Sequence, residues 1–191
     1  MKVIFNLKNI YSLITGVVTY IYVFGIDFLN SETSFFYEYD HPTVHAGYLA
    51  YINDEWKFPL TITDNLFPNE NFSIVWMDSI PIFSLILKAV YTTFGIKLSN
   101  PFPIWYLICY VLFAYYIGKT LQLRINNNII YLLSLIFIVN TPLMLNRMVW
   151  HSALAAHWLI VASIYFYIKN KDNNFNSLKE FALLTGISIF I

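Results

Sequence analysis

The feature that most constrains this chain is a set of long apolar stretches that contain no Asp, Glu, Lys or Arg. Four of them reach 17 residues or more, at 10–26, 98–118, 125–146 and 148–168. A transmembrane helix needs about 20 mostly apolar residues. Charged residues make up only 12% of the chain, against about 25% in a soluble domain. The sequence therefore predicts an all-α, polytopic integral membrane protein that forms a single membrane domain over residues 1–191.

A fifth apolar stretch, residues 79–96, differs from the others because Lys88 lies in its middle. An ionised lysine at the centre of a span costs about 3 kcal/mol. Ser84, Lys88 and Thr92 also recur at helical spacing and form one polar stripe. We therefore predict a helix at the membrane surface here, because a lipid-facing span would expose that stripe. A crossing of the membrane by residues 79–96 stays open as the alternative.

Five spans and a long first loop follow from this pattern. The predicted elements are spans at 9–29, 102–120, 127–146 and 149–168, a fifth span from about residue 179, and surface helices near 42–53 and 79–96 in a loop of residues 30–101. Seven of the eleven Lys and Arg residues then lie on the side of the N-terminus and four on the other side. Because this excess marks the cytoplasmic side, we expect a cytoplasmic N-terminus and an outer or periplasmic loop in the plasma (inner) membrane. The last apolar run, 181–191, is too short to span and predicts a truncated chain.

Several classes of chemistry are excluded by what the sequence lacks. The formal net charge is zero, so no basic patch indicates a nucleic-acid partner. Cys109 is the one cysteine, which excludes an intramolecular disulfide and a cysteine-based metal site. Gly-rich phosphate loops, zinc motifs and nucleophile elbows are absent. The predicted partner is thus the lipid bilayer, and the candidate chemistry lies in polar residues near its surface.

The densest polar cluster surrounds Asp40, His41 and His45 in the acidic first loop. Pro42 suits the first turn of a helix with Asp40 near its cap. The two histidines are four residues apart and share a helical face. A carboxylate at this position can act as a general base or help bind a divalent cation, with His41 and His45 as weak metal candidates. The alternative is that Asp40 only caps the helix.

A second cluster contains Arg147 and His151, which are also four residues apart. A guanidinium at the membrane surface suits a phosphate group, which it can bind bidentately. The alternative for Arg147 is an interaction with lipid headgroups. Asp78 and Ser79 stand before Ile-Pro and predict a helix N-cap. We take Asp78 as a further candidate for binding and structural capping as its alternative.

Taken together, these stretches resemble an uncharacterised family of bacterial polytopic membrane proteins. The resemblance rests on residues 40–48, 56–60, 78–88 and 147–158. The layout of a short tail, one span, a long loop with an early Asp and further spans also resembles the N-terminal part of GT-C-type glycosyltransferases. Those enzymes take a sugar from a polyprenyl-phosphate carrier at the outer face of the membrane.

This resemblance implies a membrane glycosyltransferase, or a fragment of one, acting on a polyprenyl-phosphate-linked sugar and a glycan, lipid or protein acceptor. It assigns Asp40 the role of catalytic base. The residues expected to bind the substrate or the carrier phosphate are His45, Asp78, Lys88, Arg147 and His151. The alternative is a non-catalytic membrane subunit or transporter component whose outer loop binds a partner.

Overall fold

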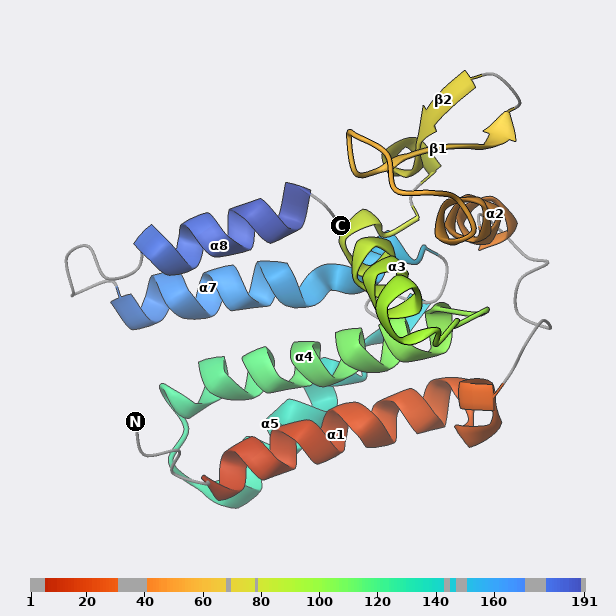
Figure 1. Cartoon of the computed structure of the whole chain (residues 1–191). Helices are drawn as coiled ribbons and strands as arrows, with labels where there is room; N and C mark the ends of the chain where they lie inside the picture. The colour runs from red at the N-terminus through yellow and green to blue at the C-terminus, as the bar shows by residue number, and fades with distance from the viewer. Residues whose placement is uncertain are drawn as a thin grey trace.

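Most of the chain is helical, as predicted (Figure 1). The structure is a computed structural model and describes residues 6–30, 41–67, 70–77, 79–142, 145–146, 151–170 and 178–189. The bundle consists of α1 (Leu7–Phe24), α4 (Phe102–Gln122), α5 (Asn128–Val139), α7 (Trp158–Asn170) and α8 (Leu178–Ile189). These helices lie side by side, and each points opposite to the one before it (Figure 1).

We call the described elements between residues 41 and 100 the cap; its buried residues Val44, Ile80 and Phe83 join the core of the bundle. The cap contains α2 (His41–Ile52), β1 (Ile62–Phe67), β2 (Glu70–Ser73), η2 (Ile74–Met77) and α3 (Pro81–Phe94). It lies at the end of the bundle where α1 ends and α4 begins (Figure 1). Two short 3-10 helices, η1 (Ile26–Asn30) and η3 (Ala153–His157), are at the same end. The cap thus covers one end of the bundle only.

Three predicted helices agree closely with the structure. The ranges near 42–53, 79–96 and 102–120 correspond to α2, α3 and α4. The start of α5 also has a clear local cause, because Asn127 Oδ1 accepts hydrogen bonds from the backbone N–H groups of Ile129 and Ile130. A side-chain oxygen in this position satisfies N–H groups that have no partner within the helix.

Three predicted spans are shorter as helices than expected. In the range 9–29, α1 ends at Phe24 and is followed by Gly25, whose φ of 77° suits glycine because it has no Cβ. In the range 127–146, α5 ends before Asn140, and Pro142 disfavours helical geometry in the residue before it. In the range 149–168, α7 begins only at Trp158, after a kink at Ala156.

The all-α prediction needs one correction, because the cap contains a two-stranded antiparallel sheet. Strands β1 and β2 pair Ile62 with Ser73 and Phe67 with Glu70, with an irregularity between them. The rings of Phe67 and Phe72 meet edge to face at 5.4 Å between centroids. An isolated hairpin of this length is only marginally stable in water. We therefore attribute its stability to its packing on α2.

Helix α4 is the centre of the bundle and packs against α1, α5 and α7. Its fully buried side chains include Tyr106, Tyr110 and Phe113. Between α1 and α4, the ring of Phe24 stacks on Tyr106 at 5.0 Å between centroids. Gly16 allows the backbones of α1 and α4 to approach closely, because a Cβ at this position would be 2.7 Å from Val111 Cα. The aromatic stack continues toward the cap, where α2 meets the start of α4.

Candidate functional site at the cap

Helix α2 begins at His41, with Pro42 in its first turn. Proline is well tolerated there because its missing N–H has no partner within the helix. His41 is buried, and its ring lies 5.6 Å from that of Phe102. The ring of His45 lies 6.0 Å from the same Phe102 ring. The prediction that both histidines share a face is confirmed, and that face packs on the first turn of α4.

His45 also has a polar contact with the end of the cap. Its Nε2 lies 2.9 Å from the backbone oxygen of Ser99. Because a carbonyl oxygen only accepts, Nε2 carries the hydrogen in this contact. Tyr48, one turn later on α2, donates its hydroxyl to the Leu98 oxygen at 2.5 Å. The two bonds hold the segment that leads into α4 against α2.

The segment that follows the second predicted cluster, at Ser152, also contacts the first turn of α4. Trp105, in the first turn of α4, donates its Nε1 hydrogen to the Ser152 backbone oxygen at 2.7 Å. His151 is the preceding residue, and its own backbone oxygen accepts from the Ala155 N–H at 3.2 Å. His45 and Ser152 therefore come from distant parts of the sequence but both contact the first turn of α4.

Three of the predicted site residues, Asp40, Asp78 and Arg147, lie outside the described residues. Their sequence neighbours are informative, however. His41 follows Asp40 directly and packs on Phe102 at the start of α4. Ser152, five residues after Arg147, accepts a hydrogen bond from Trp105 in the same turn. Among the described residues, no group of three or more His, Cys, Asp or Glu side chains could hold a metal ion.

Pro81 lies in the first turn of α3 as predicted, but Ser79 does not cap this helix. The residue at the N-cap is Ile80, which has a left-handed φ of 47° and makes no capping bond through its side chain. The Ser79 hydroxyl instead donates to the Val44 oxygen at 3.0 Å. This contact needs Gly47, because a Cβ on Gly47 would overlap the Ser79 hydroxyl. Ser79 therefore joins α2 to α3, and tertiary packing rather than helix capping determines its place.

Lys88 has an environment that the sequence pattern did not predict. Its side chain is fully buried, and its ammonium donates to the Glu55 backbone oxygen at 2.9 Å. The Nζ atom lies 4.0 Å from the ring centroid of Tyr51 and 5.0 Å from that of Trp56. Burial lowers the pKa of Lys88, although the charge of nearby Asp54 opposes this effect.

These contacts place Lys88 away from the histidines. Its partners lie at and beyond the C-terminal end of α2, whereas His41 and His45 lie in its first turns. Ten residues separate His41 from Tyr51, which is about 15 Å along a helix. The polar stripe of α3 is also divided, because Ser84 and Lys88 are buried and Thr92 is exposed. Lys88 therefore binds α3 to the rest of the cap, and its role at a phosphate stays a prediction.

Asp54 joins α2 to the hairpin through a set of hydrogen bonds that the sequence pattern also missed. Its carboxylate accepts from Lys57 Nζ at 2.8 Å and from the Thr63 hydroxyl at 2.9 Å. The backbone N–H groups of Glu55 and Asp64 donate to it as well. Burial raises the pKa of Asp54, but these hydrogen bonds outweigh it and hold the pKa well below its ordinary value.

The cap is expected to lose stability in acid because of Asp54. A carboxyl group whose pKa is lower in the folded state stabilises that state above its unfolded pKa, near 4 for Asp. This contribution is lost as the pH falls from about 4 toward the lower folded pKa. Hydrogen exchange of the β1 and β2 amides, corrected for the intrinsic effect of pH, measures it. Asp54→Asn should remove most of this pH dependence, and an unchanged profile would contradict the assignment.

Comparison with known proteins identifies a family. The model of a family described as a domain of unknown function (DUF6311) matches residues 13–191, and the chain belongs to this family. No curated protein and no solved structure gives a significant match. The family match includes nearly the whole bundle and all of the cap, so the bundle and the cap are both parts of the family's domain.

Proposed function

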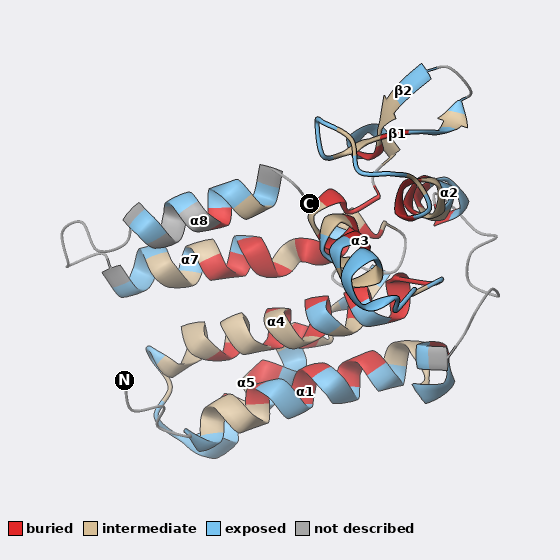
Figure 2. Cartoon of the chain, viewed as in Figure 1, coloured by how far each residue is buried: buried red, intermediate tan, exposed pale blue. Residues whose placement is uncertain are grey.

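We propose that the chain is a polytopic membrane protein whose cap lies on the outer face of the membrane. The residue types on the buried and exposed sides of α1 carry this proposal; Figure 2 shows which parts of the helix are buried. Its buried residues are polar or small apart from one aromatic: Ser12, Thr15, Gly16, Thr19 and Tyr20. Its exposed large hydrophobic residues include Leu13, Ile14, Val17, Val18 and Ile21. A helix of a water-soluble bundle has the opposite arrangement, whereas helices packed in a membrane use small and polar residues at their contacts.

Helix lengths support the same conclusion. By length and composition, α1 and α4 are able to cross a membrane, and α5 and the segment Ala153–Lys169 are shorter apolar helices. Helix α3, at 14 residues, belongs to the same class of shorter apolar helices. It differs from the others because its one lysine is buried inside the cap. The burial of Lys88 among cap residues favours the arrangement in which residues 79–96 do not cross.

The basic residues support the orientation. Lys8 donates to the backbone oxygens of Ile125 and Asn126 at 2.7 and 3.0 Å, so α1 begins beside the connection from α4 to α5. Lys119 and Arg124 lie near that connection, and the end of α7 and the start of α8 lie at the same end of the bundle (Figure 1). Positive charge collects on the cytoplasmic side of membrane proteins. The cap is at the opposite end.

Cysteine labelling in cells is expected to reach the two ends from opposite sides. A membrane-impermeant maleimide should label Lys97→Cys in intact cells and Arg124→Cys only after the membrane is opened. The background is Cys109→Ala, because the one native cysteine is buried in α4. If position 97 were reached only from the cytoplasm, residues 79–96 would cross the membrane and the proposed orientation would be wrong.

For the activity, we propose transfer of a sugar from a polyprenyl-phosphate carrier to an acceptor hydroxyl at the capped end. The supporting observation is that His41, which follows Asp40, packs on Phe102, and that Ser152, five residues after Arg147, accepts a hydrogen bond from Trp105 in the same turn of α4. Asp40 takes the proton of the acceptor hydroxyl while the hydroxyl oxygen attacks the anomeric carbon of the sugar. The bond from that carbon to the carrier phosphate breaks, and the phosphate leaves with its electron pair. We assign to Arg147, and to His151 four residues later in the sequence, the stabilisation of the developing negative charge.

Replacing Asp40 with asparagine is expected to lower transfer at least about 100-fold, because asparagine keeps the shape but cannot accept the proton. The measurement is sugar transfer by the full-length protein reconstituted with polyprenyl-phosphate sugars. Asp27→Asn is the matched control, since Asp27 is an exposed carboxylate just after α1. Transfer that is undiminished in Asp40→Asn would contradict the assigned role.

The second candidate function, a non-catalytic membrane subunit, is favoured by a different observation. The cap exposes two large aromatic side chains, Phe58 at 91% and Trp76 at 82%. Exposed aromatic residues of this kind are frequent at protein–protein contacts. A protein that co-purifies in one-to-one ratio and is lost in Trp76→Asp would support this candidate, above all if Asp40→Asn has no effect on transfer.

A further inference from the structure

Helix α3 buries its most polar residues and exposes uncharged ones. Ser84 and Lys88 lie on the buried side, against the rest of the cap. On the opposite side, Ile86, Ala89 and Thr93 are exposed, and their spacing of three and four residues puts them on one face of the helix. A helix at the surface of a water-soluble protein has its polar side in water and its apolar side buried. The exposed side of α3 therefore suits an apolar surrounding.

The exposed surface of α3 carries no charge along its whole length. Lys88 is the one charged residue between positions 79 and 96, and it is fully buried. Phe94 and Ile96 are large exposed hydrophobic residues that extend this surface to the end of the helix. Lys97 follows directly and is exposed. A lysine at the edge of an aromatic and aliphatic surface is typical of helices that lie in the plane of a membrane interface.

The contact between α3 and α4 places this surface beside a proposed span. The ring of Phe83 lies 5.4 Å from that of Trp105, in the first turn of α4. At this contact, α3 runs across the direction of the bundle helices (Figure 1). Ile104 and Ile108 are the exposed residues in this part of α4, and the exposed parts of α3 and α4 both face the viewer in Figure 2. One lipid surface can therefore cover both helices.

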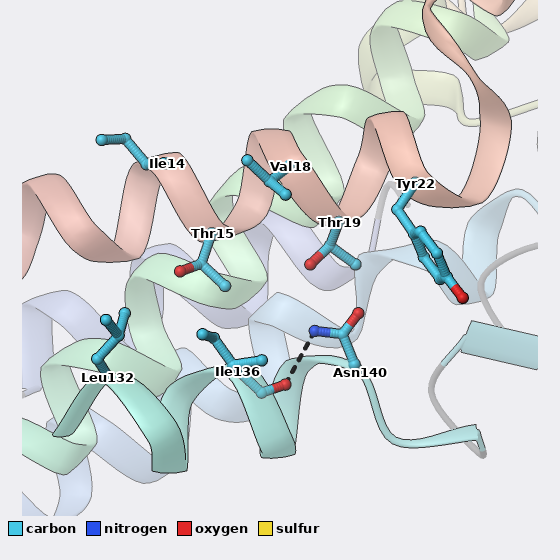
Figure 3. Close-up of a pocket in the computed structure, with 8 residues that line it drawn as sticks. All are labelled: Ile14, Thr15, Val18, Thr19, Tyr22, Leu132, Ile136 and Asn140. Atoms are coloured by element: carbon cyan, nitrogen blue, oxygen red, sulfur yellow. Dashed lines mark hydrogen bonds between the residues drawn. The ribbon is translucent and has the colours of Figure 1, made fainter. Parts of the chain in front are cut away.

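The outer limit of the lipid-facing surface is marked on α1. Ile14, Val18 and Tyr22 follow one another along one side of this helix, where they line a groove beside α5 (Figure 3). Tyrosine is enriched where the hydrocarbon core meets the headgroups, and Tyr22 is 80% exposed. Two residues further along α1, Phe24 stacks on Tyr106 of α4, in the turn that contacts α3. Helix α3 therefore meets the bundle at the level of this interface.

We infer that the exposed side of α3 binds the outer leaflet of the bilayer, with its aliphatic side chains among the lipid chains and Lys97 at the headgroups. The inference rests on the proposed function and identifies the lipid-binding surface of the cap. The buried side of α3 needs no water, because the Lys88 ammonium donates to the Glu55 oxygen within the cap. The cap is thus held on the membrane by α3 as well as by the ends of the spans.

Spin labelling tests this inference in the full chain. Single cysteines in a Cys109→Ala background carry a nitroxide, and the protein is reconstituted in phospholipid nanodiscs. Oxygen collects among lipid chains and Ni(II)-EDDA in water, so the ratio of nitroxide accessibility to the two reagents reports the surroundings. We expect this ratio to be at least about threefold higher for Ala89→Cys than for Ala46→Cys, because helices in the interface bury their apolar face in lipid. Ala46 is the matched control, since it is also an exposed alanine on a helix of the cap.

Two further positions test how α3 lies in the leaflet. Ile86 and Thr93 are seven residues apart on the same face, which is about 10 Å along the helix. Nitroxides at both positions should have the same depth. A difference of about 10 Å would mean that α3 crosses the membrane and would overturn the inference. Low accessibility to both reagents would overturn it too, because a protein partner or a second copy of the chain would then cover this face.

A label on α1 separates failure of this inference from failure of the proposed function. Ile14 is exposed on a proposed span. If the ratio is high for Ile14→Cys but not for Ala89→Cys, the membrane location stands and the lipid contact of α3 falls. If it is low for both, the proposed membrane location falls as well. Neither result depends on sugar transfer, so the proposed activity is tested separately.

Discussion

Replacing Gly16 with leucine is expected to separate α1 from α4 and to cost at least about 3 kcal/mol of stability, because overpacking a tight contact costs about 1–3 kcal/mol and sometimes more. A Cβ at this position would lie 2.7 Å from Val111 Cα and 2.8 Å from the Tyr110 oxygen. Both are backbone atoms, so no side-chain rotation can relieve the contact. The measurement is the thermal unfolding of the protein in native-lipid nanodiscs.

The matched control is Gly186→Leu, because Gly186 also lies in a helix and a Cβ there would meet nothing within 4 Å. Leucine has a better helix propensity than glycine by roughly 1 kcal/mol, so this variant should be neutral or slightly stabilising. Equal unfolding temperatures for the two variants would show that α1 and α4 are not in the close contact seen here.

The position of Gly16 also shows what a sequence pattern can and cannot predict about a bundle of this kind. The apolar stretches indicate where helices lie, because hydropathy is summed over many residues and tolerates local errors. They do not indicate which face of α1 meets α4, because Leu13, Val17 and Ile21 are as apolar as the core. The contact is instead selected by small and polar residues such as Gly16, since only they allow two backbones to approach closely.

The contacts within the cap were harder to predict than its helices, for a related reason. The ranges of α2 and α3 follow from local signals, namely proline in the first turn and the polar stripe that includes Lys88. The partners of these residues are not local. Tyr51 lies 37 positions before Lys88 in the sequence, and Asp54 reaches Thr63 only because the hairpin folds back on α2. Such contacts depend on tertiary packing, which no residue pattern within one helix records.

In the candidate site, too, local geometry was predictable from the sequence and tertiary contacts were not. The spacing of His41 and His45 correctly predicted a shared face, since helical geometry alone fixes it. That this face packs on Phe102, and that the Ser152 backbone reaches the same turn of α4 through Trp105, required the fold. No spacing in the sequence indicated the environment of Lys88, because its ammonium donates to the Glu55 backbone oxygen within the cap.

Replacing Lys88 with alanine is expected to destabilise the cap by about 2–4 kcal/mol. The change removes a buried cation–π contact worth about 2 kcal/mol and a hydrogen bond from a charged donor worth about 1.5–3 kcal/mol, and it leaves a cavity. The desolvation cost of the buried ammonium, which is recovered on mutation, reduces the total. The measurement is hydrogen exchange of the α3 and β1 amides, which reports local opening of the cap.

Two further substitutions make this prediction specific. Lys88→Met keeps most of the volume and removes the buried charge, so it should cost clearly less than Lys88→Ala. Lys97→Ala is the matched control, because Lys97 is an exposed lysine of the same cap that donates to Asn53, and exposed substitutions usually change stability by less than about 0.5 kcal/mol. If Lys88→Ala and Lys97→Ala accelerated exchange equally, the aromatic enclosure of Lys88 would contribute nothing to the cap. Faster exchange confined to Lys88→Ala would instead identify this lysine as the residue that fixes α3 across the end of the bundle.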